Sequence, residues 1–281
     1  MNSLRIIRTV AGMRHVIKAQ KAQGLSVGFV PTMGALHNGH ASLLKVARKE
    51  VNVLVSSIYT NPTQFENKID LDRYPKTENN DLKLLKQENT DFAFIPQTDD
   101  IYHELEVKKI DYGTLTNSLE GAHRPGHFDG MSTIVRKMIQ IISPDKAYLG
   151  EKDWQQLAII NRMSKIERLG AEIIGCPIIR ETSGLAMSSR NTRLSDSERT
   201  AALSISKSVF SSREGADNQT TKETEENIRQ RLIDAGLKPD YVKIVNAESL
   251  EEVQNLDVAG EKRILIAAYA GIIRLIDNGP I

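Results

Sequence analysis

Two histidines, His37 and His40, stand three residues apart where an apolar run meets a helix-like pattern. The run Val27–Val30 ends at Pro31, and apolar residues from Leu43 onward have helical spacing. Side chains three apart on a helix lie on the same side, so we expect both imidazoles to face one ligand. Imidazole donates a hydrogen bond to a phosphate oxygen, more strongly when protonated. This pair therefore suits the charge that develops in phosphoryl or nucleotidyl transfer.

The loop before His37 is expected to help hold such an anion. Backbone N–H groups at the start of a helix lack intrahelical partners and lie at the positive end of its dipole. We expect them to be unpaired here and to hold a phosphate without an acidic or metal ligand from the loop. The alternative is a surface turn with two histidines, since four-residue patterns recur by chance. The place of this pattern, directly after a strand and opening a helix, favours the functional interpretation.

Three further loops carry groups suited to the same chemistry. Gln64 follows the apolar run 51–59, and the turn Gly150–Asp153 contains a lysine that can reach a phosphate as a mobile point charge. The segment Met187–Arg190 offers two hydroxyls and a guanidinium, which suit a triphosphate and its leaving pyrophosphate. Taken singly, Lys152 reads as a solvated surface lysine, Gln156 as an exposed helical glutamine and Met187–Arg190 as a Ser-rich linker. Together with Gln156, just beyond the second loop, they are expected to converge on one cleft at the carboxyl edge of a sheet.

Strand and helix patterns alternate through the first 180 residues. The sequence predicts strands at 27–30, 51–59, 91–96, 147–149 and 173–179, and helices at 9–23, 77–89, 131–142 and 154–169, with a shaped loop over 120–130. This order is typical of an α/β fold with a Rossmann-like doubly wound parallel sheet. Beyond Arg180, helices at 195–213 and 221–235 and strands at 241–245, 264–269 and 272–276 predict a smaller α+β domain. The predicted domains are therefore 1–180 and 181–281.

Composition narrows the class of protein. The charges of the 281 residues nearly balance at +1, which argues against nucleic acid as a bulk partner. The single cysteine, Cys176, excludes an intrachain disulfide and is expected to be buried filler. No apolar run approaches the length of about 20 residues that spans a membrane. We expect a cytoplasmic protein that acts on small molecules.

These motifs resemble those of the pantothenate synthetase family over nearly the whole chain. His37-Asn38-Gly39-His40 is similar to the HIGH signature of the nucleotidylyltransferase superfamily, and Met187–Arg190 resembles a shortened KMSKS motif. The other matching runs are Pro31–Gly34, Asn61–Phe65, Arg124–Phe128, Gly150–Asp153 with Gln155-Gln156, and Gly184–Asn191. The departures are small, because Ala35 and Asn38 occupy variable positions and Trp154 stands where Tyr or Phe is expected.

The resemblance implies an ATP-dependent ligase that adenylates pantoate and then joins it to β-alanine, releasing pyrophosphate, AMP and pantothenate. It implies catalytic roles for His40 as proton donor and for His37, Lys152, Ser188, Ser189 and Arg190. The implied ATP-binding residues are Pro31, Thr32, Met33, Gly34, Ala35, Leu36, His37, Asn38, Gly39, His40, Gly150, Glu151, Lys152, Asp153, Ile179 (through its backbone), Met187, Ser188, Ser189 and Arg190. Gln64 and Gln156 are implied to bind pantoate, and Gln64 also borders the β-alanine position.

The resemblance also implies a homodimer. No protein ligand for a metal is predicted, because Mg²⁺ is expected to be held by the phosphates of ATP. The C-terminal domain is expected to act as a lid that protects the adenylate from water.

Other functions are open at this stage. A related adenylyltransferase acting on a phosphorylated acceptor would share the histidines but would have less use for Gln64 and Gln156. A nucleotide-sensing module would bind ATP without forming AMP. A transfer-RNA-charging enzyme is disfavoured, since nothing resembles an anticodon-reading domain and the balanced charge offers no obvious RNA surface.

Overall fold

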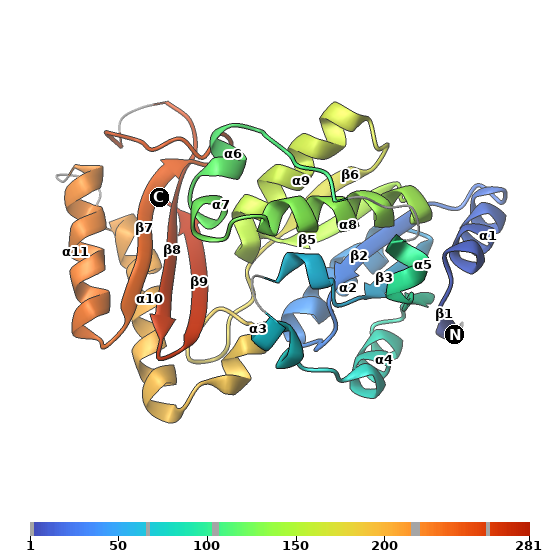
Figure 1. Ribbon diagram of the computed structural model, residues 1–281, viewed down its shortest axis with the longest axis horizontal. Coiled ribbons are helices and arrows are strands. Elements are labelled where there is room, and N and C mark those ends of the chain that lie inside the picture. Colours follow the sequence, from blue (N-terminus) through green and yellow to red (C-terminus); the bar gives the residue numbers. More distant parts are fainter. Residues whose placement is uncertain (1–2, 66–67, 103–106, 215–219, 257–258) are drawn as a thin grey trace. The chain divides into compact units, whose positions relative to one another are not determined.

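The computed structural model describes residues 3–65, 68–102, 107–214, 220–256 and 259–281, and the chain divides into two compact units (Figure 1). The N-terminal unit consists of Met1–Glu151 and Gln156–Pro177, and the C-terminal unit of Lys152–Gln155 and Ile178–Ile281. The four residues Lys152–Gln155 therefore follow a strand of the N-terminal unit in the sequence but belong to the C-terminal unit.

A six-stranded parallel sheet forms the centre of the N-terminal unit, in the order β1-β4-β3-β2-β5-β6. Its strands are β1 (Arg5–Ile7), β2 (Val27–Thr32), β3 (Val53–Ile58), β4 (Phe92–Phe94), β5 (Lys146–Gly150) and β6 (Glu172–Cys176). The doubly wound parallel sheet is confirmed. Strand β1 was not predicted, and β6 ends at Cys176, three residues earlier than expected.

Alternate residues of each central strand enter two separate cores. Phe29 and Val55 belong to the core beneath α1 (Val10–Lys21), α8 (His127–Ile142) and α9 (Trp154–Glu167). Their neighbours Val30 and Leu54 belong to the core beneath α2 (Asn38–Glu50) and α4 (Glu78–Gln87). Because both faces are covered, the strands read as continuous apolar runs. Cys176 is buried in the second core as expected, and burial raises the pKa of its thiol to about 11.

The segment 120–130 differs from the shaped loop that was predicted. It contains α7 (Glu120–His123), and α8 begins at His127 instead of 131. Gly126 has φ +79° at the start of α8, a conformation that favours glycine. Gly130 lies inside the helix, where an added Cβ would be 2.2 Å from the carbonyl oxygen of Thr63. Of these glycines, Gly126 therefore begins a helix, and Gly130 allows Thr63 to approach it closely.

The remaining short elements of this unit are η1 (Pro62–Gln64), α3 (Lys68–Asp72), α5 (Thr98–Tyr102), α6 (Thr114–Asn117) and η2 (Glu151–Asp153). The last two residues of η2 belong to the C-terminal unit.

The C-terminal unit is an antiparallel three-stranded sheet packed against two helices. Its strands are β7 (Lys238–Asn246), β8 (Lys262–Ala270) and β9 (Ile273–Pro280), in that order. The two helices are α10 (Asp196–Glu214) and α11 (Thr221–Asp234), and the short 3-10 helix η3 (Ser189–Arg193) precedes them. Ile264 and Ile266 of β8 share one core with Ile205 of α10 and Leu232 of α11. In both units, no helix of the described segments is long and apolar enough to cross a membrane.

Candidate active site

Three of the predicted loops leave the same edge of the parallel sheet. Strand β2 lies between β3 and β5, and all three run parallel. The histidine loop follows β2, the Gln64 loop follows β3, and the turn beginning at Glu151 follows β5. The expected placement of these loops at the carboxyl ends of strands is therefore confirmed, and it is where open parallel sheets bind ligands.

His37 and His40 cap the same helix reciprocally. His37 is the N-cap of α2, and its Nδ1 accepts a hydrogen bond from Gly39 N at 3.1 Å. His40 Nδ1 accepts from His37 N at 3.2 Å, and the ring centroids lie 4.2 Å apart. Imidazoles thus take the places that Ser or Thr and Glu have in a usual capping box.

This cap defines which nitrogen of each ring donates. Both Nδ1 atoms accept from backbone N–H groups, so in a neutral ring the proton lies on Nε2. In the neutral rings the two Nε2–H groups are therefore the ring donors. That both of them face one anion stays a prediction.

The loop itself differs from the expected phosphate cradle. Ala35 N and Leu36 N donate to the carboxylate of Asp81 at 3.1 and 2.8 Å, and Gly34 N donates to Thr32 Oγ1 at 3.2 Å. Asp81 comes from α4 and is almost fully buried. The prediction of unpaired N–H groups is therefore wrong at these positions, because Thr32 and a buried carboxylate from another helix accept from them. The loop 31–40 itself contains no acidic residue, as the sequence analysis assumed.

Gln64 ends the short helix η1, which several side chains hold in place. Asn61, 1% exposed, donates from Nδ2 to Gly130 O at 3.2 Å and accepts from Tyr102 Oη at 2.6 Å. Burial raises the pKa of Tyr102, so its hydroxyl stays a donor. His127 Nδ1 lies 2.9 Å from the carbonyl oxygen of Gln64. Gln156, the second predicted pantoate residue, is half-buried in the first turn of α9.

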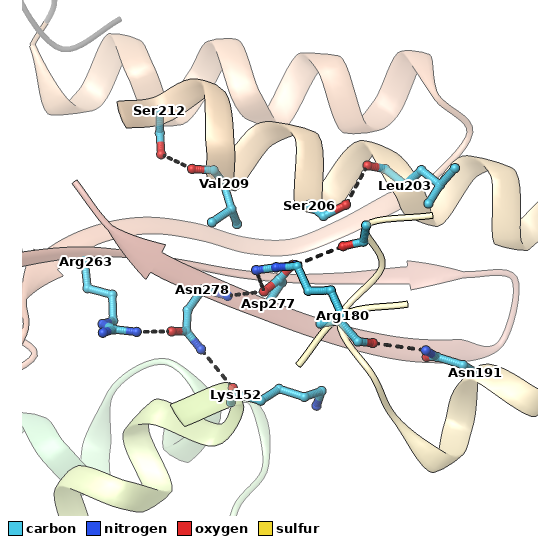
Figure 2. Close-up of polar contacts among 12 residues, drawn as sticks. Lys152, Arg180, Asn191, Leu203, Ser206, Val209, Ser212, Arg263, Asp277 and Asn278 are labelled. Atoms are coloured by element: carbon cyan, nitrogen blue, oxygen red, sulfur yellow. Dashed lines mark hydrogen bonds and ion pairs between the residues drawn. The ribbon is translucent and has the colours of Figure 1, made fainter. Parts of the chain in front are cut away.

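Lys152 lies in a turn that strand β9 and a tryptophan ring hold from within the C-terminal unit. Asn278 Nδ2 donates to Lys152 O at 2.9 Å, and Arg263 Nη1 donates to Asn278 Oδ1 (Figure 2). The Arg263 guanidinium lies 3.4 Å from the centroid of the Trp154 ring, whose Nε1 donates to Ala247 O. The Lys152 side chain is 21% exposed, and its Nζ is 4.0 Å from Asp153 Oδ2.

The segment 179–191 forms a compact turn, whereas the sequence predicted a strand end at Ile179 and no regular structure over 181–191. Met187 N donates to Ile179 O at 2.9 Å, and Arg180 pairs with Ala186 as an antiparallel bridge. Two predicted contact residues, Ile179 and Met187, are therefore neighbours. Ser188 caps η3 by accepting from Arg190 N at 3.3 Å.

A buried ion pair anchors this turn to β9. Arg180 binds Asp277 through two hydrogen bonds of 2.6 and 2.9 Å, and the Asp277 side chain is 2% exposed (Figure 2). Asp277 and Asn278 thus hold the two segments of the C-terminal unit that carry predicted site residues.

Sequence reasoning missed Asp277 and Asn278, as it missed Asp81 and His127, because each acts on a segment far away along the chain. For His127, its place in the matching run Arg124–Phe128 was the one available signal.

No metal centre emerges from the described residues, among which no group of three or more His, Cys, Asp or Glu side chains is placed to hold an ion.

Comparisons with known proteins agree over the full length. A family model described as pantoate-beta-alanine ligase matches residues 5–280. Pantothenate synthetase from Bacteroides thetaiotaomicron is 44% identical over 276 residues, covering 98% of each chain, and the one from Ruminiclostridium cellulolyticum is 42% identical with the same coverage.

Solved structures give the same result. Pantothenate synthetase from Thermus thermophilus has a TM-score of 0.90 at 37% identity over 98% of each chain. Pantoate-beta-alanine ligase from Francisella tularensis, complexed with beta-gamma ATP and beta-alanine, has a TM-score of 0.84 at 35% identity, covering 99% of this chain and 98% of the other.

Proposed function

The chain belongs to the pantoate–β-alanine ligase family, and from this premise we propose how its residues carry out the reaction. It catalyses the ATP-dependent condensation of pantoate with β-alanine to pantothenate. The observation that carries the assignment of residues is the reciprocal cap of His37 and His40, which makes Nε2 the donor of each ring at the start of α2.

The reaction has two steps. A carboxylate oxygen of pantoate attacks the α-phosphorus of ATP, and the bond from that phosphorus to the bridging oxygen breaks, giving pantoyl adenylate and pyrophosphate. The amine of β-alanine then attacks the acyl carbon, loses a proton and releases AMP. Neither step needs a nucleophilic side chain, so catalysis rests on alignment and on positive charge or N–H donors around the phosphates.

The ATP-binding residues are proposed for each unit separately. In the N-terminal unit, Pro31–His40 surround the nucleotide, and His40 donates from Nε2 to the phosphates as charge builds on the leaving pyrophosphate, with His37 as a second contact. In the C-terminal unit, Lys152 and Arg190 supply positive charge, and Ser188 and Ser189 supply hydroxyl donors. Gly150–Asp153, the Ile179 backbone and Met187 complete the site. The support for this assignment is the family membership together with the geometry of each segment.

The acceptor site is assigned to two amides. Gln64 and Gln156 bind pantoate by hydrogen bonds to its carboxylate and hydroxyls, and Gln64 also borders the amine of β-alanine. The support comes from their places: Gln64 follows β3 at the same sheet edge as the histidines, and Gln156 lies in the first turn of α9. An amide can donate to the carboxylate and the hydroxyls of pantoate, whereas a phosphorylated acceptor would call for basic residues.

Three further features belong to this proposal. Mg²⁺ enters with ATP as the MgATP substrate, held by phosphate oxygens. Removal of Mg²⁺ with a chelator should abolish AMP formation.

The enzyme works in the cytoplasm, where ATP is its substrate and a lone buried thiol stays reduced.

The enzyme functions as a homodimer, which the family resemblance supports. Sedimentation equilibrium tests this state, and a monomer at micromolar concentration would contradict it.

The C-terminal unit is further proposed to close over the adenylate when ATP binds. The support is that Ile178–Ile281 and Lys152–Gln155 form one compact body that carries its own phosphate-binding candidates. If the angle between the units in crystals with and without nucleotide were the same, this lid would be excluded.

One assay tests the function. The protein is incubated with ATP, Mg²⁺, pantoate and β-alanine, each component is omitted in turn, and AMP and pantothenate are measured. We expect pantothenate only from the complete mixture, and exchange of labelled pyrophosphate into ATP with pantoate alone. ATP binding without AMP formation would instead indicate a nucleotide-sensing module, and adenylation of a phosphorylated acceptor would indicate a related transferase.

A further inference from the structure

The segment 120–130 contains the run Arg124–Phe128 that matches the family, but the proposed reaction gives its residues no role. The structure connects it to the substrate site through His127, at the first position of α8. His127 Nδ1 is 2.9 Å from the backbone carbonyl oxygen of Gln64, and its Nε2 is 3.1 Å from Arg124 Nη1. His127 is 8% exposed, so these contacts are largely shielded from water.

The chemistry of the two partners fixes the tautomer of His127. A carbonyl oxygen only accepts hydrogen bonds, so Nδ1 must carry the proton. A guanidinium only donates, so Nε2 must be the acceptor. Arg124 also lies 3.5 Å from Glu120 of α7, which helps to hold it against the ring. The ring is therefore a neutral donor aimed at Gln64, and Arg124 maintains that state.

The neighbouring contacts make this connection rigid. Asn61 Nδ2 donates to Gly130 O, and Gly130 approaches Thr63 so closely that no Cβ would fit between them. The first turn of α8 thus contacts both ends of the segment 61–64. The backbone carbonyl of Gln64 lies 2.9 Å from His127 Nδ1. It belongs to the same residue whose side-chain amide is proposed to bind substrate.

We propose that His127 is a positioning residue, kept in its Nδ1–H tautomer by Arg124, which holds the Gln64 backbone so that the Gln64 amide meets pantoate and β-alanine. This inference rests on the proposed role of Gln64. It predicts that His127 affects the two acid substrates and leaves ATP binding unchanged.

Three substitutions at one position separate the contacts. In His127→Asn, the amide nitrogen occupies about the place of Nδ1 and can still donate to Gln64 O. In His127→Gln, the amide oxygen takes about the place of Nε2 and can still accept from Arg124, but no donor remains at the position of Nδ1, which faces Gln64. His127→Leu removes both contacts at similar volume. We expect the KM for pantoate to rise about tenfold in the Gln and Leu variants, the loss of one well-made hydrogen bond, and about twofold or less in the Asn variant. The KM for ATP should stay within about twofold in all three.

A double substitution distinguishes positioning from general loosening of the fold. If His127 acts through the Gln64 side chain, His127→Leu should add no further loss in a Gln64→Ala background. An equal additional loss in both backgrounds would overturn the proposal, as would a parallel rise of the KM for ATP. Circular dichroism and thermal melts of each variant confirm folding.

The role of Gln64 and its positioning by His127 can be refuted separately. An unchanged KM for pantoate in Gln64→Ala would refute the proposed role of Gln64 itself. A raised KM in Gln64→Ala combined with an unchanged KM in His127→Leu would leave that role intact and refute only the positioning by His127.

Discussion

The two units hold their candidate site residues by different physical means. In the N-terminal unit, the histidine and Gln64 loops are placed by adjacent parallel strands, and local caps orient their side chains. In the C-terminal unit, the segments around Lys152 and 179–191 lie outside regular strands and are held by side chains of β9, chiefly Asp277 and Asn278.

This difference has an energetic consequence. A loop placed by a sheet edge keeps its position as long as the hydrophobic cores of the sheet remain intact. A loop placed by a buried ion pair depends on one charge being matched by another, and an unmatched buried charge is costly. Single polar substitutions should therefore damage the C-terminal unit more than the N-terminal unit, where they should act on chemistry. The following predictions test this contrast.

The largest effect is expected for Asp277→Ala. It leaves the largely buried Arg180 guanidinium without its carboxylate, so the free energy of unfolding of the C-terminal unit should fall by about 3–5 kcal/mol. Urea unfolding followed by circular dichroism measures this change. The control is the double variant Arg180→Met with Asp277→Leu, which removes both charges and should recover most of the loss. A cost below about 1 kcal/mol for Asp277→Ala would remove the basis of the contrast.

The next effect concerns His40, in which capping and chemistry can be separated. His40→Asn keeps an acceptor for His37 N–H but loses the Nε2 donor. Pantoate-dependent exchange of pyrophosphate into ATP should fall about 100-fold or more, or about 2.7 kcal/mol, with little change in stability. His40→Ala should show the same loss of exchange and cost about 1 kcal/mol of stability in addition, because the cap is lost. Near-normal exchange in either variant would refute the assignment of His40.

A smaller effect is expected for Asn278→Asp, which sharpens the role of β9. The carboxylate can still accept from Arg263 but faces the Lys152 carbonyl with an oxygen instead of an N–H donor. We expect the KM for ATP to rise about tenfold, or about 1.4 kcal/mol, because Lys152 is displaced, with the KM for pantoate unchanged. Steady-state kinetics measures both constants. Equal changes in the two would mean that Asn278 supports the fold in general.

The elements that sequence reasoning predicted well are those with strong local signals. Strand β3 reads as one apolar run because both of its faces are buried, and α2 follows a clear change of period. Strand β1 was missed because it has three residues and pairs through its backbone, with exposed or half-buried side chains. The first turn of α8 was missed because its glycines resemble a loop, while they serve close packing against Thr63.

The site shows the same division. The histidines, Gln64 and the Gly150 turn could be placed because strand ends are visible in the sequence. Asp81 could not, because the backbone groups it accepts from lie 45 and 46 residues away, and Asp277 could not, because its partner lies 97 residues away. An acidic residue in a polar stretch looks the same in sequence whether it is solvated or buried against a distant loop.

The tryptophan fluorescence of this protein comes from one indole, which is stacked against the Arg263 guanidinium. Trp154 is the only tryptophan of the chain, and it lies two residues after Lys152 in the segment 152–155. Selective excitation of tryptophan therefore reports on this one turn, without contributions from elsewhere in the chain. Its emission gives a label-free signal for following the turn during unfolding of the unmodified enzyme. If Lys152 binds ATP as proposed, the emission should also change when nucleotide is titrated.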